Sequence, residues 1–236
     1  MESPARIARL AGSLYAINVV TGLFSLMYVP SRLIVHGDAA ATYGRLVASE
    51  ALFRAGIAVN VISHVVFLLL PLVLYALLST VNKKAAVVMV ALAVACVPID
   101  LLAIANQLDV LSLMHDAATG RSFAQEQIQS NLGLLLHAYG NRLLLGEVFW
   151  GLWLLPFGYL VFKSGFLPRV LGFLLMLGCF SYLIDFFARL LAPELTVPGY
   201  VTLPAALGEI GIALWMLVMG THRFGSKRMQ GIAARD

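Results

Sequence analysis

Long, continuous runs of apolar residues separated by short polar segments dominate the pattern along the chain. The runs do not alternate apolar and polar residues, as the lipid-facing strands of a membrane barrel do. A helix needs about 20 apolar residues to cross ~30 Å of hydrocarbon. Six runs reach that length, at about residues 7–29, 54–79, 85–108, 143–162, 169–191 and 202–221. The pattern therefore predicts an all-α, polytopic membrane helix bundle with six transmembrane helices.

The polar segments between the runs predict where helices end and begin. Gly165 and Pro168, between the fourth and fifth runs, are typical of a helix stop followed by a new start. Asp38 is placed to cap an interfacial helix that leads into the second run. The segment between the third and fourth runs reads as a loop followed by a helical lead-in. Because little chain remains outside the runs, we expect a single membrane domain over residues 1–236.

Composition supports membrane insertion. Of the 236 residues 61% are hydrophobic and 12% are charged, whereas about 25% are charged in a typical soluble domain. The net charge of +4 first suggests a nucleic-acid partner, but the placement of the cations explains it better. We therefore expect the lipid bilayer as partner and no nucleic acid. The sequence leaves the oligomeric state open.

The cations gather in alternate connecting segments. Ten of the 16 Lys and Arg residues lie in four of these segments: before the first run, between the second and third, between the fourth and fifth, and after the sixth. They are Arg6, Arg9, Lys83, Lys84, Lys163, Arg169, Arg223, Lys227, Arg228 and Arg235. Segments rich in Lys and Arg remain on the cytoplasmic side of a membrane. Both termini are therefore predicted to be cytoplasmic.

Two similar words indicate an internal repeat. IDLLA at 99–103 and IDFFA at 184–188 each follow a proline by the same interval, since Pro71 precedes Asp100 as Pro156 precedes Asp185. The second and third runs thus resemble the fourth and fifth in a parallel repeat. The first run can be aligned with the fifth in two ways. YAIN at 15–18 resembles YLID at 182–185, and RLAG at 9–12 resembles RVLG at 169–172, but the two alignments conflict. Chance similarity among leucine-rich helices is the alternative explanation.

Four acidic residues interrupt the apolar runs at a similar depth. Asp100, Glu147 and Asp185 each lie 16 residues from a cytoplasmic cation, or ~24 Å along a helix. Glu209 lies 14 residues from one, or ~21 Å. The four acids are therefore expected to form one layer in the outer part of the membrane.

Ionisable residues inside a membrane span are costly and mark candidate functional sites. We expect an outward-facing polar pocket whose ligand-binding residues are Asp100, Glu147, Asp185, Glu209, Arg142, Arg189 and His64. The alternative is structural, because such residues also hold helices together. Asp185 and Arg189, spaced i,i+4, can form a simple intrahelical pair.

Three hypotheses for function follow. The first is binding or transport of a small cationic or proton-coupled ligand in this pocket. The second is a metal-dependent hydrolase or transferase acting on outer-leaflet lipid, with candidate metal ligands His64, His137, Glu147 and Asp185; oxygen-rich sets suit Mg²⁺, Mn²⁺ or Ca²⁺, and Zn²⁺ if His64 takes part. The third is a structural or accessory subunit. No catalytic motif is recognisable, which disfavours an enzyme and identifies neither catalytic residues nor a cofactor.

Several words resemble a known family. ARIARLAGSLYAINVVTGLF at the start, LIVHGDAAAT with ASEALFRAGI, LHAYG, and VFKSGFLPRVLGFLL followed by YLIDFF are similar to the bacterial multi-pass family known as domain of unknown function 4386. The resemblance extends from about residue 5 to 220. It implies an integral protein of the bacterial plasma (inner) membrane, without an assigned activity or site residues that could be transferred.

Overall fold

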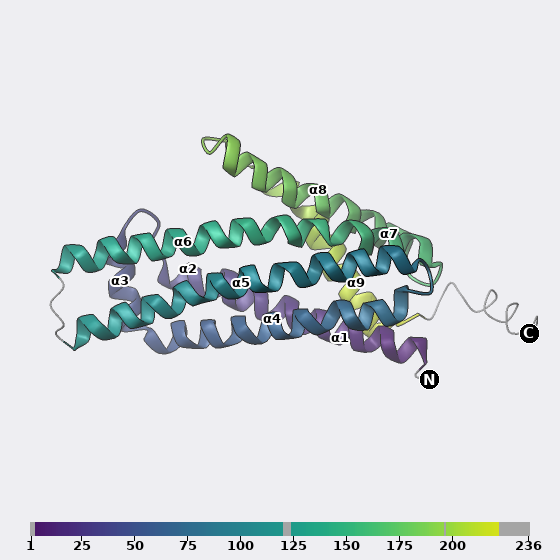
Figure 1. Cartoon of the computed structure of the whole chain (residues 1–236), viewed down its shortest axis with the longest axis horizontal. Helices are drawn as coiled ribbons and strands as arrows, with labels where there is room; N and C mark the ends of the chain where they lie inside the picture. The colour runs from purple at the N-terminus through teal and green to yellow at the C-terminus, as the bar shows by residue number, and fades with distance from the viewer. Residues whose placement is uncertain (1–2, 120–123, 196, 222–236) are drawn as a thin grey trace, which may run out of the picture. The chain divides into compact units, whose positions relative to one another are not determined.

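A computed structural model describes residues 3–119, 124–195 and 197–221. Within these ranges the chain is helical and contains no strand, which confirms the predicted fold class. The elements, shown in Figure 1, are α1 (Pro4–Gly22), the π-helix η1 (Leu23–Tyr28), α2 (Val29–Leu33), α3 (Ala39–Ala48), α4 (Glu50–Leu78), α5 (Lys83–Ala118), α6 (Gln125–Leu152), α7 (Leu154–Ser164), α8 (Arg169–Leu191), the 3₁₀ turn η2 (Gly199–Val201) and α9 (Leu203–Val218).

Six helical stretches of the described residues are long and apolar enough to cross a membrane, in agreement with the six predicted runs. The chain is thus a multi-pass membrane protein in contact with lipid. The first stretch joins α1, η1 and α2, and the fourth joins α6 and α7. Four of the cations that predict the orientation lie outside the described residues: Arg223, Lys227, Arg228 and Arg235. The cytoplasmic location of both termini stays a prediction.

Two helix boundaries lie where the polar segments predicted them, at Asp38 and at Gly165 with Pro168. The Asp38 carboxylate accepts a 2.8 Å hydrogen bond from the Ala41 backbone N–H and so caps α3. Gly165 follows α7 with a positive φ of 73°, and Pro168 immediately precedes α8. A left-handed glycine ends a helix without the steric cost of a Cβ atom. Both predicted boundaries are confirmed.

Two helices extend well beyond the apolar runs. The third span was expected to end near residue 108, yet α5 continues to Ala118. The fourth run was expected to begin near 143 after a helical lead-in, and α6 begins at Gln125, which confirms the lead-in. No proline interrupts 99–118 or 125–152, so the helices can continue where the side chains become polar. The predicted loop between them is correspondingly shorter.

The described chain forms two compact units. Unit 1 comprises residues 1–17, 66–96 and 146–236, and unit 2 comprises 18–65 and 97–145. Their boundaries fall within helices α1, α4, α5 and α6. The expected single domain stays a prediction.

In unit 1, glycines bring helices into backbone contact. A Cβ atom on Gly158 of α7 would lie 2.6 Å from the Gly172 carbonyl oxygen of α8, and one on Gly208 of α9 would lie 3.0 Å from the Leu175 backbone nitrogen. Small residues allow this close approach where membrane helices pack. The contacts fix α7, α8 and α9 against one another and set the positions of the acidic residues on α8 and α9.

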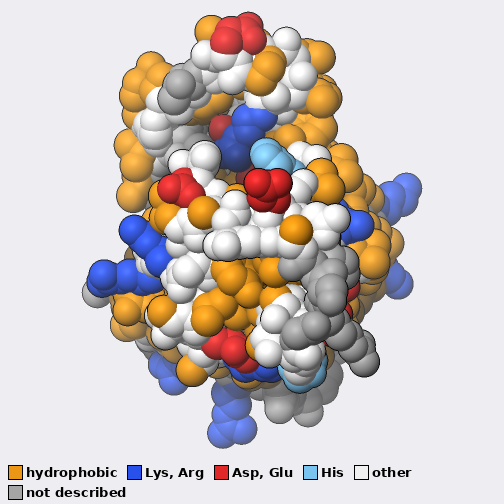
Figure 2. All heavy atoms as spheres, turned by 90° about the vertical axis from the view of Figure 1, so that its left-hand side faces the viewer, with side chains coloured by type: hydrophobic (Ala, Val, Ile, Leu, Met, Phe, Trp, Pro, Cys, Tyr) orange, Lys and Arg blue, Asp and Glu red, His pale blue; other side chains and the backbone are white. Residues whose placement is uncertain are grey.

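Unit 2 has an apolar core. Buried side chains from α2, α3, α4, α5 and α6 form one cluster that includes Leu33, Leu46, Phe53, Ile104 and Leu132. Figure 2 shows one face in space-filling form, on which acidic, basic and histidine side chains lie among hydrophobic ones. On α4 in this unit, Arg54 and Glu50 form an exposed 2.6 Å ion pair.

Candidate functional site

Three of the four predicted acids lie in unit 1, on three different helices. Glu147 belongs to α6, Asp185 to α8 and Glu209 to α9. We call the group formed by Glu147, Asp185 and Glu209 with Tyr15, Tyr182 and Arg189 the carboxylate cluster. The fourth predicted acid, Asp100, lies in unit 2 and has different neighbours.

Two tyrosines hold Glu209. The Tyr15 hydroxyl of α1 donates a 2.8 Å hydrogen bond to Oε2, and the Tyr182 hydroxyl of α8 donates one of 3.0 Å to Oε1. Each carboxylate oxygen therefore receives one phenolic proton donor, which offsets part of the cost of removing the acid from water. The Tyr182 ring meets Trp150 edge to face, with centroids 6.4 Å apart.

Asp185 and Glu147 form the other part of the cluster. The Asp185 side chain is 12% exposed and lies 2.6 Å from the guanidinium of Arg189, one turn further along α8, whose side chain is 57% exposed. Glu147 interacts electrostatically with both Asp185 and Arg189. Its buried Oε2 atom accepts no hydrogen bond from the described residues. Asp185 thus pairs with Arg189, and Glu147 from a second helix interacts with both.

Tyr182 connects the two parts of the cluster. Its hydroxyl contacts Glu209 and also interacts electrostatically with Glu147. Within the described contacts of unit 1, the cluster therefore contains three acids and one arginine, which interacts with Asp185 and Glu147. Its formal charge is −2 if every acid is ionised. The intrahelical pair that sequence spacing suggested is present, but it is one part of a larger group.

In unit 2, Asp100 of α5 lies opposite His64 of α4. The Asp100 side chain is 1% exposed and that of His64 9%, and Oδ2 lies 3.2 Å from Nε2. The other ring nitrogen of His64, Nδ1, lies 2.8 Å from the backbone oxygen of Asn60. A carbonyl oxygen only accepts, so this contact requires a proton on Nδ1. The Nε2–Oδ2 contact then holds one shared proton, on either the histidine or the aspartate.

Unit 2 contains further polar interactions in its helices. The Tyr139 phenol of α6 interacts with Asn60 and Asp100, and Ser63 donates a 2.9 Å hydrogen bond to Oδ1 of Asn18. The buried Oδ1 atom of Asn60 accepts no hydrogen bond from the described protein groups. Helices α1, α4, α5 and α6 all contribute to this polar core.

The remaining predicted site residues lie elsewhere on α6. Arg142 is half-buried and His137 is exposed, and both belong to unit 2. Among residues 3–119, 124–195 and 197–221, no group of three or more His, Cys, Asp or Glu side chains is arranged to hold a metal ion. The candidate metal ligands His64, His137, Glu147 and Asp185 are thus not assembled into such a group.

The sequence pattern did not indicate Tyr15 and Tyr182 as site residues. The signal was present, because YAIN and YLID each place a tyrosine three residues before a polar side chain. Both tyrosines donate to the same carboxylate. A tyrosine in an apolar run is ordinary, so its role becomes visible only when the helices are packed.

Comparison with known proteins gives one family and one partial relative. The model of the family described as "Domain of unknown function (DUF4386)" matches residues 10–220. A protein named "Uncharacterized protein" from Archaeoglobus fulgidus is 34% identical over 88 residues, which are 36% of this chain and 50% of the relative. The match thus spans half of the relative's length. No solved structure matches the chain.

Proposed function

The chain belongs to the DUF4386 family, and from that premise and the geometry of its buried acids we propose that it binds a small organic cation in exchange for protons. The carboxylate cluster is the proposed binding site. The observation that supports this proposal is that three acids from three helices, Glu147, Asp185 and Glu209, belong to one group of interacting side chains in the described part of unit 1. In this group Arg189 pairs with Asp185.

The charge of the cluster supports a cationic ligand. Placing an ionised side chain in a membrane span costs ~2.5–3.5 kcal/mol on insertion scales. Arg189 compensates one of the three acids, so two carboxyl groups must each hold a proton or face a cation. Trp150 and Tyr182 add aromatic surface beside the acids, and aromatic faces attract organic cations.

Exchange with protons follows from the same carboxyl groups. A cation and a proton that occupy the same oxygen atoms compete, so each lowers the apparent affinity for the other by the same factor. In unit 2, His64 and Asp100 hold a proton of their own in a buried pair. That pair belongs to the other unit, and the protons that compete with the cation are those of the cluster carboxyl groups. Transport of the cation across the bacterial inner membrane is part of the same proposal.

Thermal unfolding of the detergent-purified protein tests this proposal. We expect one member of a panel of quaternary and primary ammonium compounds to raise the unfolding temperature of the wild-type protein in a saturable manner. A ligand at 100 times its dissociation constant adds ~2.7 kcal/mol to the free energy of unfolding. Lowering the pH should raise the apparent dissociation constant by up to about tenfold per unit if one proton competes.

Two site variants and one control make the test specific. Asp185→Asn and Glu209→Gln should lose the shift, because each removes a carboxylate of the cluster. Glu194→Gln should keep it, because Glu194 is exposed beyond the end of α8. If no cation or pH change distinguishes the site variants from the wild type and the control, the acids serve only to hold helices together and the proposal is wrong.

A further inference from the structure

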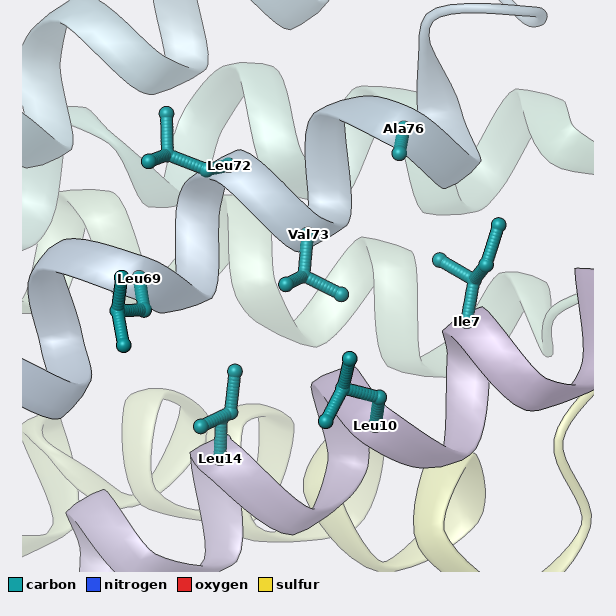
Figure 3. A pocket seen from close by; sticks show the side chains of 7 residues that line it. All are labelled: Ile7, Leu10, Leu14, Leu69, Leu72, Val73 and Ala76. Carbon is teal, nitrogen blue, oxygen red and sulfur yellow. The ribbon is translucent and has the colours of Figure 1, made fainter. Parts of the chain in front are cut away.

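A lateral groove lies between α1 and α4 within unit 1, and none of the residues that line it belongs to the carboxylate cluster. Figure 3 shows Ile7, Leu10 and Leu14 of α1 facing the groove from one side. Leu69, Leu72, Val73 and Ala76 of α4 face it from the other. The groove has a volume of about 430 Å³.

The lining restricts the chemistry of the occupant. All seven side chains are aliphatic, and a polar group placed among them would lose its hydrogen bonds to water without replacement. Both helices belong to candidate membrane spans, and Leu10, Leu69 and Leu72 are between 46% and 50% exposed. The groove therefore opens towards hydrocarbon and fits an acyl chain.

One end of the groove is basic. Ile7 and Ala76 lie at the same end in Figure 3, because α1 and α4 run in opposite directions there. Near that end, Arg6 precedes Ile7 and Arg9 follows it by two residues in the sequence, and Lys83 and Lys84 follow the short turn after α4. All four basic side chains are exposed. The other end, at Leu14 and Leu69, continues into apolar helix.

From the apolar groove and its basic end we infer that this is a binding site for an anionic phospholipid. One acyl chain lies between Leu10 and Leu72, and the head-group phosphate lies beside Arg6, Arg9 and the lysines at the start of α5. Basic residues at a membrane surface attract anionic lipid, and the groove adds shape to that attraction. This site is independent of the proposed cation-binding function.

Native mass spectrometry of the delipidated protein tests the inference with phosphatidylglycerol and phosphatidylcholine of identical chains. We expect the wild type to bind one phosphatidylglycerol at least tenfold more tightly than phosphatidylcholine. Arg6→Gln with Arg9→Gln should reduce that preference to less than threefold. These arginines are exposed, so the substitutions leave the helix packing intact. Equal affinity of the wild type for both lipids would overturn the inference.

A second pair of variants tests the groove itself. Leu72→Trp should fill the groove and weaken phosphatidylglycerol binding at least tenfold. The control Val170→Trp adds the same side chain to α8 at a residue that is 70% exposed and does not line the groove, so it should bind as the wild type does. If Leu72→Trp retains wild-type affinity, the lipid binds elsewhere and the groove assignment is wrong. Should Leu72→Trp not fold, the arginine variant alone decides.

Discussion

At the scale of single residues, the pair of His64 and Asp100 shows how a buried charge is accommodated in a membrane span. The Asn60 carbonyl fixes the proton on Nδ1 of the histidine, which leaves Nε2 to share a proton with the aspartate. The pair is then neutral as a whole, whichever residue holds the proton. Its stability depends on both partners being present.

This dependence predicts that Asp100→Leu is strongly destabilising. Removing one member of a buried pair typically costs about 3–5 kcal/mol, because Nε2 of His64 would face an apolar side chain. Asp100→Asn should cost less than about 1.5 kcal/mol, since its amide can still donate to Nε2. Unfolding titrations in detergent micelles measure both variants.

Two further variants serve as controls for this experiment. Asp109→Asn on the same helix is the matched control, and because Asp109 is exposed it should unfold as the wild type does. The double variant His64→Leu with Asp100→Leu should recover part of the loss, since it leaves neither partner unpaired. If Asp100→Leu were as stable as Asp109→Asn, the pair would contribute nothing to the fold.

At the scale of elements, the close approach of α7 and α8 depends on having no side chain at their crossing. A Cβ atom on Gly158 would meet both the Gly172 carbonyl oxygen and the backbone nitrogen of Met176, at 2.6 and 2.8 Å. Neither atom belongs to a side chain that could rotate away. The two helices would have to separate. Asp185 would move with α8, because it belongs to that helix.

We therefore expect Gly158→Ala to lower the unfolding temperature, with a loss of about 1–3 kcal/mol typical of overpacking. Gly133→Ala on α6 is the control, because nothing lies within 4 Å of its added Cβ atom. That substitution should be neutral or stabilising by up to about 1 kcal/mol, since alanine favours a helix over glycine. Differential scanning fluorimetry of both variants gives the sign directly. Equal behaviour would show that the helices tolerate separation.

Element lengths show where sequence patterns stop being informative. Apolar runs locate the part of a helix that lies in hydrocarbon, but α5 continues to Ala118 and α6 begins at Gln125 because helical hydrogen bonds do not require apolar side chains. The prolines likewise did not predict where helices are interrupted. Helix α4 continues through Pro71, whereas the corresponding Pro156 follows an interruption at Trp153 between α6 and α7. The internal repeat stays a prediction.

At the scale of the whole molecule, the sequence was sufficient to predict the all-α fold and the number of spans, since both follow from hydrophobic length. It also identified the acids Glu147, Asp185 and Glu209 that the structure brings together in unit 1. It did not identify Tyr15 and Tyr182 as their partners, nor that Asp100 pairs with His64. Such pairings depend on how each helix is rotated, and residue spacing along one helix does not determine that rotation relative to its neighbours.

The orientation of the molecule is the remaining global property that the sequence predicts, through the excess of Lys and Arg in alternate connecting segments. Single cysteines can test it, in a background where Cys96 and Cys179 are replaced by alanine. Thr80 is exposed in the turn between α4 and α5, next to Lys83 and Lys84, and Glu194 is exposed after α8. The positive-inside rule places the first position in the cytoplasm and the second outside.

A membrane-impermeant maleimide should therefore label Glu194→Cys in intact cells and Thr80→Cys only after permeabilisation. The reverse pattern would invert the orientation and place the basic end of the lipid groove in the outer leaflet. Labelling of both positions in intact cells would contradict the six spans themselves, because three of those spans, the third to the fifth, separate Thr80 from Glu194. An odd number of crossings requires the two positions to lie on opposite sides of the membrane.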